Sequence, residues 1–229
     1  MPDIKTQSIE YPANGISGMG YLAQPGDGDP HPGVIVIQEW WGLDGHIKSI
    51  ADRFAREGFV ALAPDLYHGH SATEPDEARK LVMNLNREQA IKDLTGAVAH
   101  LQSMAEVAPK KLACIGFCMG GSLTLALAAA STHIAAAAPF YAGMQPPASE
   151  LAKIEAKMFC AFGADDAGIP MDNVRKFEDA LKSSDRDAVV KVYEGAPHSF
   201  FNDTRESYRP EAAKDAWERS LALFREVLA

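Results

Sequence analysis

One cysteine stands where a catalytic nucleophile would be expected. Cys118 lies in the segment 116–121, GFCMGG, which has the spacing of the G-x-S-x-G nucleophile elbow with cysteine in place of serine. An apolar run precedes this segment and a small-residue helical pattern follows it, so we expect a sharp strand-to-helix turn. Free amides at the helix start favour a thiolate over a thiol, and the Met119 amide can point at a developing oxyanion. A buried structural cysteine in a glycine-rich turn is the alternative interpretation.

An acid and a histidine follow the ends of two later strands. The apolar run 158–162 leads to Asp165 and Asp166, and the run 189–193 leads to His198. Because the carboxyl ends of parallel strands meet at one edge of a sheet, these side chains can converge on the nucleophile. Their order along the chain (nucleophile, acid, histidine) is that of the elbow-bearing folds. The sequence therefore predicts a triad, with the choice between the two aspartates open at this point.

Further candidates stand next to other strand ends. Glu39 comes just after the apolar run 34–37, where an acid is costly to bury without a partner, so we predict a functional role over that of a surface loop acid. Four aromatic residues at or near strand ends are candidates for lining a substrate pocket, with core packing as the alternative for each: Trp40, Trp41, Tyr141 and Phe200.

Short apolar runs alternate with helical patterns along the chain, which indicates right-handed crossovers. We predict a single α/β domain, residues 1–229, with a mostly parallel sheet, helices on both faces and an N-terminal hairpin that turns at Asn14-Gly15. The expected strands are 34–37, 59–63, 111–115, 135–138, 158–162 and 189–193, and the expected helices are 46–57, a helix from Asn86, 120–130, a helix through 174–181, and 213–228.

Composition excludes several classes of protein. The 229 residues carry 22 Lys+Arg and 31 Asp+Glu, a formal net charge of −9, which argues against a nucleic-acid or anionic-membrane partner. The three cysteines (Cys114, Cys118 and Cys160) suggest neither a disulfide framework nor a zinc finger. Because the first residues lack the apolar core of a signal peptide, we predict a cytoplasmic location.

One loop contains two closely spaced histidines. His68 and His70 follow Asp65, but no third ligand motif accompanies them, so we interpret the spacing as chance. We expect no metal and no cofactor.

Several motifs together resemble the dienelactone hydrolase family (carboxymethylenebutenolidases) of α/β-hydrolases. They run almost from end to end of the chain: 37–42 (IQEWWG), 63–67 (APDLY), 116–121 (GFCMGG), 166–170 (DAGIP) and 197–200 (PHSF). The resemblance implies that Cys118 is the nucleophile, His198 the general base and acid, and Asp166 the residue that orients the imidazole. Asp166 is preferred over Asp165 because of its spacing to the Ile-Pro pair.

The resemblance also implies roles for the neighbours of the triad. Glu39 would contact the thiol at rest and help it ionise, and the Trp40 amide would complete the oxyanion hole. Family members that act on dienelactone hold its carboxylate with two arginines, one of them four residues after the histidine. Asn202 takes that place here, with Arg205 three residues beyond. Arg79, in the helix after Tyr67, could supply one cationic contact or lie on a solvated helix face.

These features predict a hydrolase of small lactones or activated esters, either a monomer or a small homo-oligomer. Two alternatives from other classes are a non-catalytic binding module on a hydrolase fold and a thiol redox protein that uses Cys118. The filled triad positions count against the binding module, and the lack of a CxxC arrangement counts against the redox protein.

Overall fold

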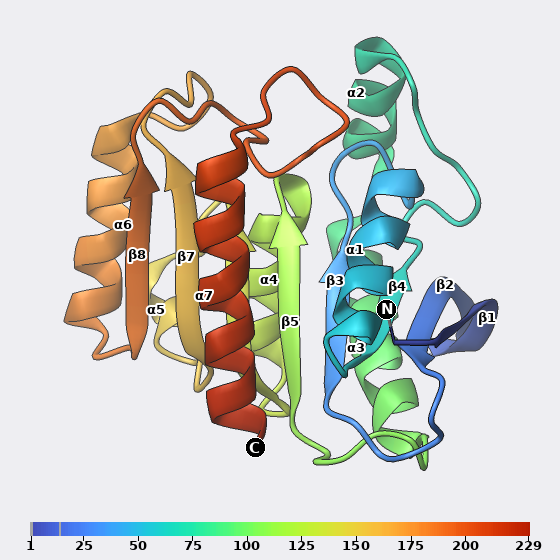
Figure 1. Ribbon diagram of the computed structural model, residues 1–229. Coiled ribbons are helices and arrows are strands. Elements are labelled where there is room, and N and C mark those ends of the chain that lie inside the picture. Colours follow the sequence, from blue (N-terminus) through green and yellow to red (C-terminus); the bar gives the residue numbers. More distant parts are fainter. Residues whose placement is uncertain (1, 14) are drawn as a thin grey trace. The chain divides into compact units, whose positions relative to one another are not determined.

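The computed structural model describes residues 2–13 and 15–229, and it divides into two units, Met1–Cys114 and Ile115–Ala229. Each unit combines strands with helices, and Figure 1 labels them in chain order. The two units are described in turn.

The first unit contains the strands β1 (Ile4–Ala13), β2 (Ile16–Pro25), β3 (Gly33–Ile37) and β4 (Val60–Pro64), in the order β1-β2-β4-β3. Strands β1 and β2 form the predicted antiparallel hairpin, while Asn14 of the predicted turn lies outside the described residues. Strands β3 and β4 pair in parallel. Every residue of β3 and β4 is buried, which explains why their sequences show no polar alternation.

The helices of this unit are α1 (Gly45–Arg56), α2 (Pro75–Asn84) and α3 (Arg87–Ser103). Helix α1 ends just before Gly58, whose φ of 86° stops the helix close to the predicted end at residue 57. The side chain of Asn86 accepts a hydrogen bond from the amide of Gln89, so the predicted start of α3 is confirmed. Helices α1 and α3 pack on opposite faces of the strands (Figure 1).

The second unit is built on β5 (Leu112–Phe117, which begins at the end of the first unit), β6 (Ile134–Phe140), β7 (Lys157–Gly163) and β8 (Ala188–Tyr193), in that order. Strand β7 pairs in parallel with both β6 and β8. The helices are α4 (Met119–Ala130), α5 (Ala148–Leu151), α6 (Met171–Ser183) and α7 (Pro210–Leu228). Helix α7 packs on β6 and β7 from the face opposite to α4 (Figure 1).

The helices predicted through 174–181 and over 213–228 are present in the second unit, and each buries one apolar face. Val174, Phe177 and Leu181 are the buried residues of α6. The stripe through Trp217 and Phe224 is the buried face of α7. These faces cover the parallel strands whose carboxyl ends carry the candidate triad.

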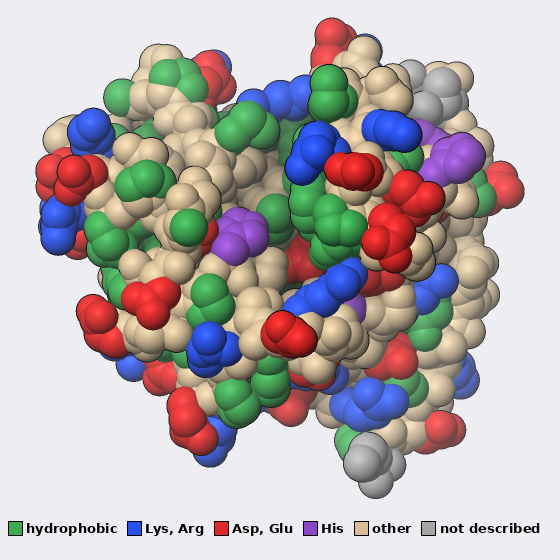
Figure 2. Space-filling model, turned by 90° about the horizontal axis from the view of Figure 1, so that it is seen from above, with side chains coloured by type: hydrophobic (Ala, Val, Ile, Leu, Met, Phe, Trp, Pro, Cys, Tyr) green, Lys and Arg blue, Asp and Glu red, His purple; other side chains and the backbone are tan. Residues whose placement is uncertain are grey.

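Charged side chains of both signs lie on the surface. Figure 2 shows acidic and basic side chains interspersed over the face seen from above. No helix formed by residues 2–13 and 15–229 combines the length and the apolar character needed to cross a membrane.

Candidate active site

Cys118 occupies the turn between β5 and α4 in a strained backbone conformation. Its φ of 56° and ψ of −115° lie in a region that non-glycine residues rarely adopt, at a cost of about 1–3 kcal/mol. Three backbone hydrogen bonds hold it there: its amide donates to the carbonyl of Phe140 at 3.1 Å, and its carbonyl accepts from the amides of Gly121 at 3.0 Å and Ser122 at 3.3 Å. Such strain at the tip of a single turn is typical of functional sites.

The glycines of the elbow are required by close backbone approaches. A Cβ on Gly116 would collide with the carbonyl of Gly120, and a Cβ on Gly121 would collide with the carbonyl of Phe140. Any larger residue at either position would therefore force strand β5, helix α4 and strand β6 apart. This is the steric reason for the glycine spacing that the sequence shows.

Of the two neighbouring aspartates, Asp166 is the one that faces the histidine. Its Oδ2 lies 2.6 Å from Nδ1 of His198, and its side chain is 1% exposed. Its other oxygen, Oδ1, accepts hydrogen bonds from the amides of Gly168 at 2.8 Å and Ile169 at 3.1 Å. Asp165 is exposed. The carboxylate of Asp166 is thus fixed in one orientation, with one oxygen left for the imidazole.

The imidazole of His198 is also hydrogen-bonded to the side chain of Cys118. Burial by itself would lower the pKa of His198, but the hydrogen bonds to Asp166 and Cys118 and the charges of both groups outweigh burial and raise this pKa to about 10. Cys118, His198 and Asp166 therefore form a continuous hydrogen-bonded chain within the second unit. Such a chain can activate a thiol and can hold a proton for a leaving group.

Of the other predicted residues of the second unit, Tyr141 lies beside this chain. The Tyr141 ring lies 5.1 Å from the imidazole of His198, and the residue has a φ of 37° with its amide donating to Ala161 at 2.7 Å. Phe200 is fully buried behind it, with ring centroids 5.4 Å apart. Asn202 is fully buried too, and its Oδ1 accepts from the amide and the hydroxyl of Thr204.

A hollow of about 350 Å³ opens beside His198 in the same unit. Its walls are largely apolar and include Gly143, Ile169 and Pro197. Helix α4 steadies one side of it, because the Ser122 hydroxyl accepts from the amide of Met144, the neighbour of Gly143. A small, mostly apolar acyl or alkoxy group would fit such a space.

The remaining candidates lie in the first unit. Glu39 is 1% exposed and follows β3 directly after Gln38. The rings of Trp40 and Trp41 meet edge to face with centroids 5.0 Å apart. Arg79 pairs with Asp76 of the same helix at 3.0 Å and is 65% exposed, which matches the solvated helix face named as the alternative.

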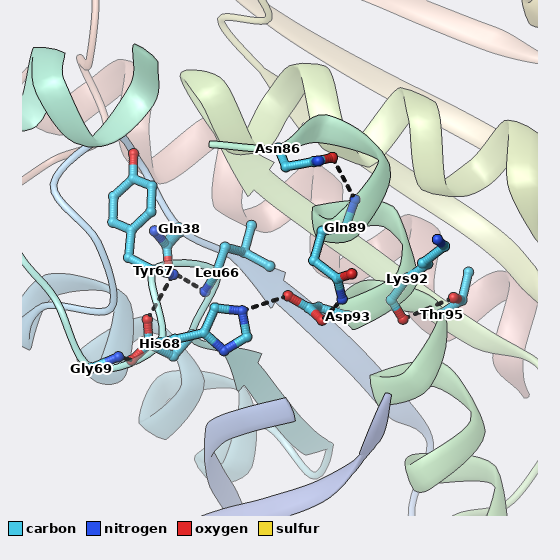
Figure 3. Close-up of polar contacts among 11 residues, drawn as sticks. Gln38, Leu66, Tyr67, His68, Gly69, Asn86, Gln89, Lys92, Asp93 and Thr95 are labelled. Atoms are coloured by element: carbon cyan, nitrogen blue, oxygen red, sulfur yellow. Dashed lines mark hydrogen bonds and ion pairs between the residues drawn. The ribbon is translucent and has the colours of Figure 1, made fainter. Parts of the chain in front are cut away.

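The contacts that hold the segment of Glu39 and Trp40 are not predicted from the sequence. The hydroxyl of Tyr67 donates to the carbonyl of Trp40 at 3.2 Å. Oε1 of Gln38 accepts from the amide of Leu66 at 3.1 Å (Figure 3). The segment APDLY is visible as a motif, but nothing in it shows which backbone group the tyrosine reaches.

Comparison with known proteins decides the family. The profile of the dienelactone hydrolase family matches residues 19–228. The chain belongs to the dienelactone hydrolase family. It is 39% identical over 230 residues to protein usf of Aquifex pyrophilus, covering 97% of this chain and 99% of that one. It is 35% identical over 243 residues to a Synechocystis protein named "putative carboxymethylenebutenolidase", covering 99% of this chain and 98% of the relative.

A solved structure extends the likeness to three dimensions. The crystal structure titled "putative dienelactone hydrolase" from Klebsiella pneumoniae has a TM-score of 0.91 and 31% identity, covering 98% of this chain and 99% of its own. The chain is thus a carboxymethylenebutenolidase-like hydrolase with the α/β-hydrolase fold, and the predicted family and fold class are both confirmed. Hydrolases of this family act on small-molecule substrates.

Proposed function

We propose that this member of the dienelactone hydrolase family hydrolyses lactones or activated esters through a thioester intermediate on Cys118, without a metal or cofactor. The observation that carries the proposal is the hydrogen-bonded chain from Asp166 through His198 to Cys118 at a strained elbow. The three residues of this hydrogen-bonded chain have the types and the order of a Cys–His–Asp triad.

In the first half of the reaction, Cys118 gives its thiol proton to His198, the thiolate Sγ attacks the substrate carbonyl carbon, and a tetrahedral oxyanion forms. When the carbon–oxygen bond breaks, the leaving alkoxide or enolate takes the proton from His198. The raised pKa of His198 means that the imidazole holds this proton until the leaving group needs it. The acyl group stays on Cys118 as a thioester.

The oxyanion needs donors that are in place before it forms. Met119 is the first residue of α4 and follows the nucleophile directly, so we assign its amide as the first donor. From the family resemblance we assign the second donor to the amide of Trp40, and we assign to Glu39 the role of helping the thiol to ionise when substrate arrives.

In the second half, His198 takes a proton from water, and the resulting hydroxide attacks the thioester carbonyl. The carbon–sulfur bond breaks, Sγ leaves as a thiolate beside the protonated imidazole, and the carboxylic acid is released. Asp166 keeps Nδ1 of the imidazole in one orientation through both halves, because its own position is fixed by Gly168 and Ile169.

The substrate we propose carries no obligatory carboxylate. At the position where the resemblance implies an arginine stands Asn202, whose Oδ1 is already engaged by Thr204. Arg79 is exposed and paired with Asp76. Neither offers the bidentate cationic fork that holds a carboxylate firmly.

The test is turnover of p-nitrophenyl acetate combined with intact-protein mass spectrometry. We expect a burst of p-nitrophenol, an acetyl adduct on Cys118, and loss of both burst and adduct in Cys118→Ala. Cys160→Ala is the matched control, because that cysteine is buried in β7 and should leave the burst unchanged. An adduct without turnover would favour thiol redox chemistry, and neither adduct nor turnover would favour a binding module.

A further inference from the structure

A pocket of about 440 Å³ opens in the first unit between the segment 66–70, the end of α2 and the start of α3. Its walls carry apolar side chains from all three parts, namely Leu66, Leu81, Leu85 and Ala90. Its volume lies in the range of small-molecule sites, and its described lining contains no member of the candidate triad.

A buried carboxylate forms part of this pocket. Asp93 of α3 lines the pocket and is 1% exposed. Its Oδ1 accepts from Nε2 of Gln89 at 2.9 Å, and its Oδ2 lies 3.0 Å from Nε2 of His68 as an ion pair (Figure 3). Among the residues that the structure describes, Oδ2 has no well-aligned hydrogen-bond donor. A buried carboxylate oxygen in this state costs free energy that a better donor would recover.

The electrostatic surroundings favour a cation as that donor. The titratable groups that line the pocket are Asp93, His68, His70 and Tyr67, and its described lining contains no lysine or arginine. From strand β1, the phenol of Tyr11 also faces this region: burial, Asp93 and Asp65 all raise its pKa. Once the two imidazoles are neutral, the pocket is therefore negative, which excludes an anionic ligand and attracts a positive one.

We propose that this pocket binds an organic ammonium ion. The hydrocarbon body of the ligand lies against the leucine side chains, and its ammonium group donates to Oδ2 of Asp93. His68 competes for the same oxygen when the imidazole is protonated. Its backbone has a φ of 50°, and it precedes Gly69 with a φ of 93°, so the imidazole is carried on a tight turn rather than on a helix or strand. The site is separate from the hydrolytic proposal and does not depend on it.

Charge discrimination among ligands of one shape is the first test. The probes are 2-phenylethylammonium, its neutral analogue 2-phenylethanol and the anion 3-phenylpropanoate, each titrated into the whole chain by isothermal titration calorimetry. The ammonium ion should bind at least about tenfold more tightly than the alcohol, as expected for one hydrogen bond to a charged group. The anion should bind least tightly of the three. Equal binding of the cation and the alcohol, or no binding of the cation, would overturn the proposal.

Two substitutions with opposite expected effects, Asp93→Asn and His68→Gln, make up the second test. Asp93→Asn should weaken binding of the ammonium ion about tenfold and leave 2-phenylethanol unchanged. Asp76→Asn, on the exposed face of α2, is the control and should change neither. Unchanged binding of the ammonium ion by a folded Asp93→Asn variant would refute the assignment.

The second substitution, His68→Gln, removes the competing cation and keeps the proposal testable if Asp93→Asn does not fold. His68→Gln should bind the ammonium ion more tightly than the wild type, because no imidazole then competes for Oδ2 of Asp93. The neutral probe 2-phenylethanol should bind equally to both proteins. Binding of the ammonium ion that is unchanged or weaker in the variant would contradict the role of Asp93 as the shared partner.

Discussion

Replacement of Asp166 by asparagine tests the order of groups in the triad most directly. The amides of Gly168 and Ile169 both donate to Oδ1, so the carbonyl oxygen of an asparagine must take that place. The asparagine NH₂ group then points at Nδ1 of His198, which the carboxylate oxygen approaches to 2.6 Å in the wild type. Nδ1 is forced to accept a hydrogen bond, and the ring proton moves to Nε2.

An imidazole in that tautomer can no longer take the proton of Cys118 or of water. We expect kcat to fall about 10³–10⁴-fold, the scale found when a triad aspartate is replaced by asparagine in other hydrolases. A fall of 10⁴ corresponds to about 5.5 kcal/mol of lost transition-state stabilisation. The pKa of His198 should also drop from about 10, because one of its hydrogen bonds and one neighbouring negative charge are removed.

Single-turnover kinetics with p-nitrophenyl acetate measure the first effect, and an NMR titration of the His198 ring measures the second. Asp165→Asn is the matched control, because this neighbour is exposed and should leave both unchanged. A kcat within about tenfold of the wild type in Asp166→Asn, or a large loss in Asp165→Asn, would refute the assignment of the acid.

Four further outcomes follow from the same contacts. Cys118→Ser should be at least about a hundredfold slower than the wild type in ester turnover, because a hydroxyl needs a stronger base than a thiol, and an equal rate would contradict thiolate attack. Tyr67→Phe should lower kcat about tenfold with little change in KM or melting temperature, because its hydroxyl holds the loop to which we assign an oxyanion donor. Neutral lactones should be hydrolysed at least as well as carboxylated dienelactone, and Arg79→Ala should not alter that ratio; a preference for dienelactone above about a hundredfold would show that a cationic contact exists. Finally, the raised pKa of His198 adds stability that is complete below its ordinary value of 6.5 and is lost as pH rises through about 10, so the urea unfolding free energy should decline over that range more steeply in the wild type than in His198→Gln.

The parts of the structure that the sequence predicts well are those set by local patterns. The apolar runs in β3 and β4 are fully buried, and the cap at Asn86 forms as the spacing predicts. The placement of Asp166 and His198 after consecutive strands of one parallel sheet brings them within 2.6 Å of each other. Periodicity and strand order are sufficient for such statements, because parallel strands deliver their carboxyl ends to one edge.

Contacts made by loops are not encoded in this way. The hydrogen bond from Tyr67 to Trp40 joins residues 27 positions apart and depends on a turn in which His68 adopts a positive φ. The sequence shows a tyrosine after an aspartate, but neither the turn nor the carbonyl that the hydroxyl reaches. The roles of Trp40, Trp41 and Phe200 in binding substrate stay predictions for the same reason.

Asp93 is a residue whose burial the helical pattern of its own segment indicates. Leu94, Val98 and Leu101 form a buried stripe, and the buried face of α3 also includes Ala90, Asp93 and Ala97. Positions 90, 93 and 97 are neighbours on one helical face, so an acid between two alanines at this spacing is typical of a buried charge.

A buried acid requires a partner, and the partner of Asp93 is distant in the chain. His68 and His70 have no third ligand motif in their own loop, whereas the acid that faces His68 stands 25 residues later, on a helix. Local spacing therefore cannot pair the two groups, although each is visible by itself. Because a single carboxylate with a competing imidazole offers one charged acceptor, the pair suits a cation that donates hydrogen bonds better than a metal that needs several ligands.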